Sequence, residues 1–349
     1  PDVAYTVWKY YQATGDWEFL SEYGAEVVFE VMRFLASHAY YKKTKGHYEF
    51  IRLLGPDEYH ENVDNNFFTN FQARYVARVT GELIELLRER APNRLDELFA
   101  KLGIDGDELD LWADMAERIF VPEPDEETKL IEQFRGFFSL EDIEPNELAK
   151  RLQDKSEYWG WPNGIAVETQ VSKQADVTQL FALHPHAYST EVMRANYDYY
   201  EPRTQHGSSL SHSVYSMVAA WIGDLKEAYR YFMNSLSIDL LNTNKAISGG
   251  TFIGGIHTAA CGVSWQIAVH GFAGTFVTKK GLEINPHLPP DWKSMRYPFI
   301  YQGRRAQIEL TRDRLTISAD ETNDGDFVFF SQGTSHRVAA GSREVVTFA

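Results

Sequence analysis

The chain has 349 residues, 24% of them charged and 44% hydrophobic, which is enough to bury the core of one large domain and one small one. Its formal net charge of −16 argues against binding to nucleic acid or to an anionic membrane surface, and no apolar run is long enough to span a membrane. The single cysteine, Cys261, cannot form an internal disulfide, so we expect a cytoplasmic protein in which this thiol is packed in the core rather than acting as a nucleophile.

Hydrophobic periodicity predicts mainly helical structure over residues 1–274. An apolar helix face over residues 3–11 ends at Gly15 and Asp16, where glycine can close one helix in the left-handed region and aspartate can cap the next. The same Gly-Asp pair recurs at 223–224, between two further apolar helix faces. Two such hairpins, far apart in the chain, indicate a repeated helix-pair architecture.

The densest polar cluster is the segment 55–66, which holds four acids, one histidine and three asparagines. Its acids are Asp57, Glu58, Glu61 and Asp64. Because their ionised forms repel one another, we expect at least one raised pKa, as a general acid needs at neutral pH. One alternative is a proline-led turn that caps a helix starting near Asp64. Another is a metal site that also uses His60, although the spacing matches neither an EF-hand nor a zincin.

Two later segments carry weaker signals. The aromatic, glycine-rich stretch 159–164 could stack on a sugar face, but core packing explains its tryptophans equally well. His184 and His186 have a spacing seen in zinc sites, yet two ligands without partners indicate structural residues.

Short polar motifs follow at 173–174, 206–211 and 254–257. An isolated Lys-Gln pair such as 173–174 is usually a surface feature. The hydroxyls of Ser208 and Ser209, the amides exposed by a neighbouring glycine and a helix expected to begin near Ser209 suit an oxyanion. The serine pair reads equally well as a plain helix N-cap, and the two interpretations are compatible.

After Gly274 the pattern changes to period two, which predicts strands. The expected strands are 306–311, 315–318, 327–330 and 345–348. We expect a small β domain over residues 275–349 with a packing role, because it contains no concentrated polar motif.

The segment 55–66, with Thr69 and Asn70 after it, resembles the acid loop of the family 65 glycoside hydrolases and phosphorylases, which act on α-linked glucosides such as kojibiose, maltose, nigerose and trehalose. Three further segments resemble the family in its own order, and so do several flanking stretches. The three are 173–176, 206–211 and 255–259, the last leading to Trp265 and Gln266. The resemblance implies a mainly α fold: part of an (α/α)6 barrel of helix hairpins over 1–274, followed by a small antiparallel, β-sandwich-like domain over 275–349.

The resemblance also implies roles for individual residues. Glu58 stands in the place of the general acid, and Asp57 and Glu61 would shape its field or contact sugar hydroxyls. Lys173 and Gln174 would hold the glucosyl unit. Phosphate would be bound by His206, Ser208, Ser209 and His257.

The segment 206–211 also bears on the reaction type. The family's hydrolases place a catalytic base in this segment, and here it contains no acid. The resemblance therefore implies an inverting phosphorylase, which converts an α-glucosyl disaccharide and inorganic phosphate to β-glucose 1-phosphate and a free acceptor, with no cofactor and no metal. An inverting α-glucosidase of the same family remains an alternative. So does a non-catalytic chain that binds sugar or packs against another chain.

Members of the family are usually much longer, with an N-terminal β-sandwich and the opening helices of the barrel. This chain begins at Pro1 on what reads as a mid-barrel helix, so we expect a fragment that is inactive alone and folds as a half-barrel. Its partners would be a second copy or the missing N-terminal half. The Asp57 and His60 forms of the loop favour kojibiose-like phosphorylases over maltose-specific ones.

Overall fold

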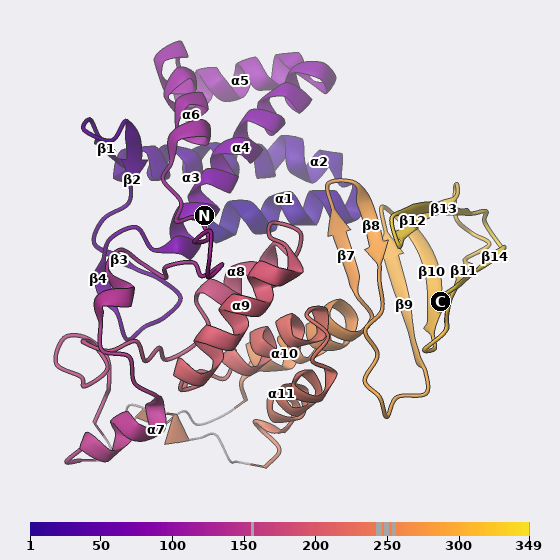
Figure 1. The fold of residues 1–349 in the computed structure, drawn as a ribbon. Coiled ribbons are helices and arrows are strands. Elements are labelled where there is room, and N and C mark those ends of the chain that lie inside the picture. Colours follow the sequence, from indigo (N-terminus) through magenta and orange to yellow (C-terminus); the bar gives the residue numbers. More distant parts are fainter. Residues whose placement is uncertain (155–156, 242–245, 248–250, 253–255, 349) are drawn as a thin grey trace. The chain divides into compact units, whose positions relative to one another are not determined.

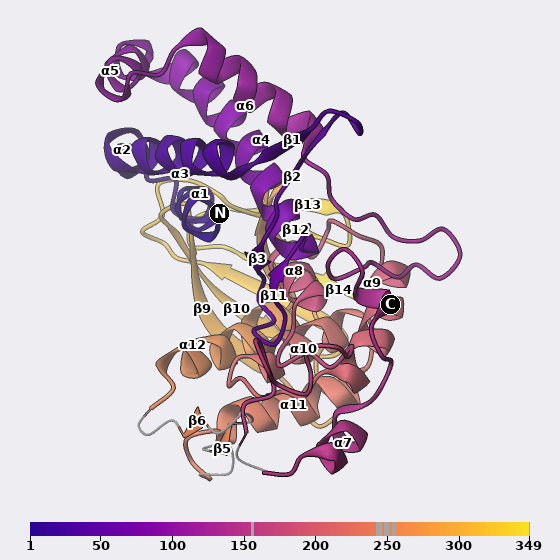
Figure 2. The same cartoon turned by 90° about the vertical axis from the view of Figure 1, so that its left-hand side faces the viewer.

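The computed structural model describes residues 1–154, 157–241, 246–247, 251–252 and 256–348 (Figures 1 and 2). The chain divides into two compact units. Unit 1 contains Pro1–Leu53 and Asn62–Pro122, and unit 2 contains Leu54–Glu61 and Glu123–Ala349. Residues 55–61 of the acid loop therefore belong to unit 2, with the segments 173–174 and 206–211.

Unit 1 is built of helices with one small hairpin. Its elements are α1 (Asp2–Thr14), α2 (Trp17–Phe19), the π-helical turn η1 (Leu20–Gly24), α3 (Ala25–His38), β1 (Tyr40–Lys42), β2 (His47–Glu49), α4 (Phe67–Arg90), α5 (Pro92–Leu102) and α6 (Gly106–Arg118). Both views show α5 and α6 beside α4, against which they pack. The core consists of buried apolar side chains such as Val28, Met32 and Leu83.

The first predicted hairpin of helices is confirmed in detail. Gly15 closes α1 with φ 70°, and its N–H donates to the carbonyl of Tyr11. Asp16 accepts the N–H of Phe19 and so caps α2. Glycine is favoured at the first position because an L side chain is strained at positive φ, and aspartate at the second because its carboxylate replaces a missing backbone acceptor.

The helix after the acid loop starts later than expected. It begins at Phe67 and is capped by Asn66, whose Oδ1 accepts the N–H of Thr69 at 2.9 Å. Asp64 instead accepts the N–H of Arg52 at 3.1 Å. Asp64, Asn65 and Asn66 are all residue types that can cap a helix, so the sequence alone does not show which of them does. The backbone conformation selects Asn66.

Unit 2 contains the remaining helices. They are α7 (Pro145–Leu148), α8 (Val177–Leu183), α9 (Thr190–Tyr200), α10 (Ser211–Trp221), α11 (Leu225–Ser237) and α12 (Thr258–Gln266), the last continued by the π-helical η5 (Ile267–Phe272). Figure 1 shows α10 and α11 lying together as a hairpin. Gly223 turns the chain with φ 86°, and Asp224 caps α11 by accepting the N–H of Glu227. The second predicted hairpin is thus confirmed.

The C-terminal strands form two four-stranded sheets. Their order is β14-β11-β10-β9 and β13-β12-β8-β7. The strands are β7 (Thr275–Thr278), β8 (Gly281–Ile284), β9 (Met295–Tyr301), β10 (Arg304–Leu310), β11 (Arg314–Ala319), β12 (Phe327–Ser331), β13 (Thr334–Val338) and β14 (Arg343–Thr347). All pairings with a recorded register are antiparallel except β8 with β12, which is parallel. The four strands expected from alternation are confirmed as β10, β11, β12 and β14.

The position of Cys261 and the length of the helices bear on two further expectations. Cys261 is exposed on α12, so the expectation of a core thiol is wrong. Nowhere in the described part of the chain is a helix both long and apolar enough to cross a bilayer.

Candidate active site

The acid loop is the connection between two short paired strands, β3 (Leu53–Leu54) and β4 (Glu61–Val63). Tyr59 anchors it, because its ring is fully buried in an apolar cluster and stacks on Trp159. The Tyr59 carbonyl accepts the N–H of Trp161 at 3.0 Å, and its hydroxyl donates to Gln205. The residues on either side of Tyr59 are therefore held in a fixed position.

Asp57 is the buried carboxylate of this loop and is 1% exposed. Its Oδ1 accepts the N–H groups of Tyr59 and Lys173 at 3.1 and 2.8 Å. Its Oδ2 accepts from His60 Nδ1 at 2.6 Å and from Gln133 Nε2 at 3.0 Å. With four donors on two buried oxygens, Asp57 has no surface for a sugar hydroxyl, so the contacts favour the second of its two expected roles, shaping the site.

Asp57 and His60 form a buried ion pair. His60 donates from Nδ1 to Asp57 and from Nε2 to the carbonyl of Thr169 at 2.8 Å, so both ring nitrogens carry protons. Desolvation would raise the pKa of Asp57, but the His60 charge and the four donors outweigh it and the pKa is lowered. Desolvation likewise opposes the charge on His60, yet Asp57 and the Thr169 carbonyl raise its pKa. The raised carboxyl pKa expected in this segment therefore does not belong to Asp57.

Glu58 points away from that buried pair, with its side chain 45% exposed. Lys173 Nζ contacts its Oε2 at 2.6 Å, and Gln174 Nε2 lies 3.4 Å from its Oε1. The Gln174 amide also donates to the carbonyl of Pro56, while its own Oε1 is buried without a hydrogen-bond partner. The structure thus brings the acid-loop carboxylate together with the Lys-Gln pair, both of which the resemblance had assigned to substrate.

Lys173 links two motifs through its backbone. Its N–H donates to Asp57 Oδ1, and its carbonyl accepts the N–H of Gly207, both at 2.8 Å. One residue earlier, Ser172 accepts the N–H of Gln205 at 2.8 Å. The acid loop and the segment 206–211 therefore lie on either side of one short stretch of chain.

His206 lies in this segment with φ 57°, a left-handed conformation uncommon outside glycine. Its Nδ1 lies 2.9 Å from Ser211 Oγ, and its Nε2 lies 3.0 Å from the Tyr231 hydroxyl. Burial, together with the charges of His212 and Arg230, lowers the pKa of His206 to about 3, so the ring is neutral at pH 7. Since both ring nitrogens already have partners, the expectation that His206 contacts phosphate is not supported, and its contacts favour a role in shaping the turn.

Ser208 and Ser209 lie in the turn before α10, which starts at Ser211 rather than near Ser209 as expected. Ser208 Oγ accepts the N–H of Leu210 at 3.3 Å. Both serines are partly exposed. The N–H groups of Ser211 and Ser213 donate to the carbonyls of Ser208 and Leu210, so an anion at this helix N-terminus would be bound mainly by the serine hydroxyls.

His257 is the N-cap residue of α12, and its side chain is 7% exposed. Its backbone N–H and its Nδ1 both bond the carboxylate of Asp239, at 2.8 and 2.6 Å. The opposite nitrogen, Nε2, is buried without a hydrogen-bond partner. Among the described residues, no contact joins His257 to Glu58 or to Ser208. Gly254 and Gly255 of this motif lie outside the described residues.

The two tryptophans of the segment 159–164 differ in burial, and each fits one of the two interpretations offered by the sequence. Trp159 is 5% exposed and packs in the core with Tyr59, whereas Trp161 is 41% exposed. The neighbouring Tyr158 donates to the carbonyl of Glu58 at 2.9 Å. Desolvation and the charges of Glu58, Asp57 and Glu61 raise its pKa to about 12, so Glu61 also acts electrostatically at this side of the loop.

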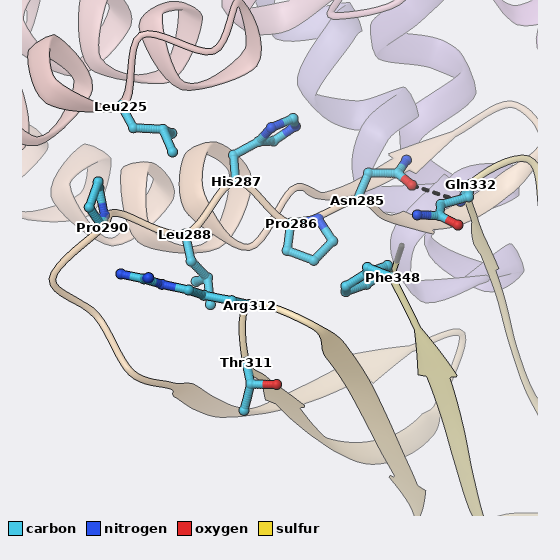
Figure 3. A pocket seen from close by; sticks show the side chains of 10 residues that line it. All are labelled: Leu225, Asn285, Pro286, His287, Leu288, Pro290, Thr311, Arg312, Gln332 and Phe348. Carbon is cyan, nitrogen blue, oxygen red and sulfur yellow. Dashed lines mark hydrogen bonds between the residues drawn. The ribbon is translucent and has the colours of Figure 1, made fainter.

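A separate cleft of about 580 Å³ lies between the end of the helices and the β sheets of unit 2 (Figure 3). Its lining consists of Leu225, Asn285, Pro286, His287, Leu288, Pro290, Thr311, Arg312, Gln332 and Phe348. None of the residues expected to act in catalysis or binding lines it. Among the described residues there is no group of three metal-ligating side chains arranged to hold an ion.

Several residues around the site could not have been identified from the sequence. Gln133, Thr169 and Asp239 contact the acid loop or His257 from distant positions in the chain. Thr169 acts through its backbone carbonyl, so its side-chain type gives no signal. Asp239 lies in an unremarkable helix end, and only its bond to His257 distinguishes it.

Comparison with known proteins shows that the chain is similar in sequence to several phosphorylases. The chain is 51% identical over 319 residues to the 1,2-alpha-glucosylglycerol phosphorylase of Bacillus selenitireducens, covering 91% of this chain and 41% of that protein. It is 37% identical to the kojibiose phosphorylase of Thermoanaerobacter brockii, covering 90% of this chain and 40% of that one. The chain thus spans about two fifths of the length of these relatives.

Structure and family assignment agree with these relatives. A solved structure from the human microbiome, provisionally named a kojibiose phosphorylase, superimposes with a TM-score of 0.83 at 27% identity, covering 99% of this chain and 49% of that one. This likeness confirms the expected fold class, helix hairpins of an (α/α)6 barrel with a C-terminal antiparallel β domain. Residues 1–266 match the glycosyl hydrolase family 65 central catalytic domain, and residues 277–338 match the family's C-terminal domain. The chain belongs to glycosyl hydrolase family 65.

Proposed function

We propose that this chain carries the acid and phosphate sides of an inverting α-glucoside phosphorylase. The reaction is the phosphorolysis of an α-linked glucosyl disaccharide to β-glucose 1-phosphate and a free acceptor. One observation carries the proposal: Lys173 bonds the acid loop through its N–H and the acid-free segment 206–211 through its carbonyl, both at 2.8 Å. A proton donor and an anion-binding turn therefore lie on either side of one residue.

Glu58 is the general acid in this proposal. Its carboxylate is half exposed, so a substrate can reach it, while the Asp57 carboxylate beside it is fully enclosed. Lys173 and Gln174 contact both Glu58 oxygens and so define where the proton is delivered. In the complex the same two side chains, with Glu61, would turn to the hydroxyls of the glucosyl unit.

Phosphate is the nucleophile, and its donors are Ser208, Ser209 and His257. The two serine hydroxyls beside the N-terminus of α10 supply neutral donors, and Nε2 of His257 supplies a charged donor in the imidazolium form of the ring, because Nδ1 already donates to Asp239. These local donors are needed because the net charge of −16 repels an anion from the molecule as a whole. No cofactor or metal is required, because phosphate itself attacks the anomeric carbon.

The substrate has two candidates. A disaccharide is favoured by the kojibiose and nigerose phosphorylases among the relatives, at 37% identity each. Glucosylglycerol is favoured by the 51% identity to the glucosylglycerol phosphorylase. The hydrolase alternative would need a second carboxylate. Two carboxylates belong to the network around His206: Glu201 is engaged with Tyr231 and Arg230, and Glu227 with Arg230.

We also propose the division at residue 274 as the boundary between catalytic and β domains, and a cytoplasmic location. A protein partner is proposed for the outer face of α1 and α3, where Val3, Tyr23 and Phe34 are each more than 60% exposed. It would be a second copy or another part of the catalytic barrel. Light scattering of the protein at its full natural length tests the first, since a monomer would exclude the second copy.

The test of the proposed function is a substrate panel. The protein at its full natural length is incubated with kojibiose, nigerose, maltose, trehalose and 1,2-α-glucosylglycerol, each with and without inorganic phosphate. We expect glucose 1-phosphate from at least one substrate and no free glucose without phosphate. Glucose release that persists without phosphate would establish the hydrolase instead.

A further inference from the structure

His60 joins three stretches of chain at one buried point. Its ring is 4% exposed and lies between the Asp57 carboxylate at 2.6 Å and the Thr169 carbonyl at 2.8 Å. The rings of Phe134 and Phe137 pack against it at centroid distances of 5.2 and 6.0 Å. His60 therefore has two hydrogen bonds in opposite directions and no room to choose others.

The Asp57 carboxylate connects the fixed His60 ring to Lys173, which in turn contacts Glu58. Oδ2 is fixed by His60 and by Gln133 Nε2, and Gln133 is itself held by the Ser172 hydroxyl at 3.1 Å. Oδ1 then accepts the N–H of Lys173, whose Nζ contacts Glu58 Oε2 at 2.6 Å. A continuous chain of short contacts runs from the His60 ring to the proposed acid.

We propose that His60 is a positioning residue for proton transfer: as an imidazolium it holds Asp57, and through Asp57 it holds Lys173 and Glu58 in the geometry that delivers the proton. This inference rests on the proposed function, because it takes Glu58 as the acid. His60 itself contacts no substrate, since aromatic rings and protein carbonyl and carboxylate groups surround it.

Histidine suits this position for a geometric reason. The ring places two N–H donors on opposite edges of a rigid plane, and here those donors span a carboxylate and a carbonyl. A glutamine amide presents both its donors from one nitrogen and cannot reach both acceptors. The charges that bear on the ring are those of Asp57 and Asp176, and both favour the imidazolium.

The experiment measures kcat and KM for His60→Gln, Asp57→Asn and the double variant in the protein at its full natural length. We expect kcat to fall about ten- to a hundredfold in each single variant, because small displacements of a catalytic group cost this much. KM for disaccharide and for phosphate should change less than about threefold, since neither substrate touches the pair. The double variant should lose no more than either single one, because the two residues act as a unit.

The matched control is His336→Gln. His336 also pairs with a carboxylate, Glu344 at 3.5 Å, and stacks on Phe329, but it lies in β13 of the C-terminal sheets. Its variant should keep wild-type kcat and KM. If His60→Gln does not fold, Gln133→Met replaces it, because it removes one donor to Asp57 without leaving a buried charge. Its expected result is a severalfold lower kcat with unchanged KM.

The outcomes separate the two proposals. Wild-type kcat in folded His60→Gln or Gln133→Met would overturn the positioning role, and so would a rise in KM with kcat unchanged. A wild type without phosphate-dependent activity would overturn the proposed function instead. Independently of activity, ¹⁵N NMR of the histidine ring should show both His60 nitrogens protonated at pH 7.5, and a neutral ring would contradict the ion pair.

Discussion

Two histidine–aspartate pairs in unit 2 have the same short distance and opposite uses. His60 and Asp57 meet at 2.6 Å, and so do His257 and Asp239. The far nitrogen of His60 donates to the Thr169 carbonyl, whereas the far nitrogen of His257 is buried and has no hydrogen-bond partner among the described residues. Both ring nitrogens of His60 are thus bonded within the protein, and we call this the closed pair. Nε2 of His257 is available to a ligand, and we call this the open pair.

This difference teaches how to assign a role to a histidine in a polar cluster. A ring whose two nitrogens are both satisfied by the protein supports the structure around it, as His60 and His206 do. A ring oriented by a carboxylate on one side and unpaired on the other is suited to a ligand, because a buried unpaired polar atom costs free energy until it is bound. The predictions below test this distinction around the acid and the anion.

The largest effect is expected for the acid itself. Glu58→Gln should lower kcat at least about a hundredfold, because the amide cannot donate the proton to the leaving oxygen. The apparent KM for phosphate should stay close to that of the wild type, since the serine and histidine donors are unchanged. Steady-state kinetics at saturating disaccharide make this measurement, and a variant with near wild-type turnover would remove Glu58 from its role.

The next effect concerns the open pair. His257→Ala should raise the apparent KM for phosphate about ten- to a hundredfold, because a hydrogen bond to a charged group contributes about 1.5–3 kcal/mol. KM for the disaccharide should change much less. His336→Gln serves as control, since His336 also pairs with a carboxylate but lies in β13 of the C-terminal sheets. An unchanged phosphate KM in His257→Ala would move the anion site elsewhere.

Asp239→Asn tests the same pair more gently. The amide keeps an acceptor for the His257 backbone N–H but no longer carries the charge that orients the ring. We expect a rise in phosphate KM that is smaller than that of His257→Ala. A larger rise would show that Asp239, rather than His257, carries the interaction.

Ser208→Ala is expected to have a smaller effect again. A hydrogen bond to a charged group contributes about 1.5–3 kcal/mol, and because Ser208 is partly exposed we expect the lower end, a rise of roughly tenfold in phosphate KM with kcat retained. Because Ser208 Oγ also accepts the N–H of Leu210, Ser208→Thr is the informative control. It keeps the hydroxyl and should behave like the wild type. Equal effects of both substitutions would indicate a disturbed turn rather than a lost phosphate contact.

The smallest expected effect is a change with pH in the stabilisation that the His60–Asp57 pair contributes to folding. The folded-state pKa of His60 is raised above its ordinary 6.5, so its contribution is fully present below 6.5 and is lost as pH rises through the folded pKa. The difference in unfolding free energy between wild type and His60→Gln should therefore shrink as pH rises. Urea unfolding at a series of pH values measures this. A difference that grows with pH would mean that His60 is neutral in the folded protein.

Local features were predicted well from the sequence where a residue type decides the backbone. The turns at Gly15-Asp16 and Gly223-Asp224 follow from left-handed glycine and a capping aspartate, and the strands β10 and β11 follow from strict alternation. Features that depend on distant partners were not predicted. The burial of Asp57, the donors on His206 and the exposure of Cys261 all depend on which segments pack together.

The candidate site shows the same division. Glu58 and the Lys-Gln pair were each expected in the substrate site, and the structure places Lys173 Nζ 2.6 Å and Gln174 Nε2 3.4 Å from the Glu58 carboxylate. Neither Asp239 nor Thr169 could be singled out, because one lies at an ordinary helix end and the other contributes a backbone carbonyl. Sequence motifs indicated the groups that would meet the substrate, and long-range contacts determine which of those groups are free to do so.

The most direct test of the account is the anomeric configuration of the product. One protein acid, Glu58, and phosphate attacking from the opposite ring face give a single displacement, which inverts the α-linkage. Proton NMR recorded immediately after the protein at its full natural length is mixed with an active α-glucoside and phosphate should show β-glucose 1-phosphate as the first product. Initial formation of α-glucose 1-phosphate would contradict the account, because it requires a second protein nucleophile and a covalent glucosyl intermediate.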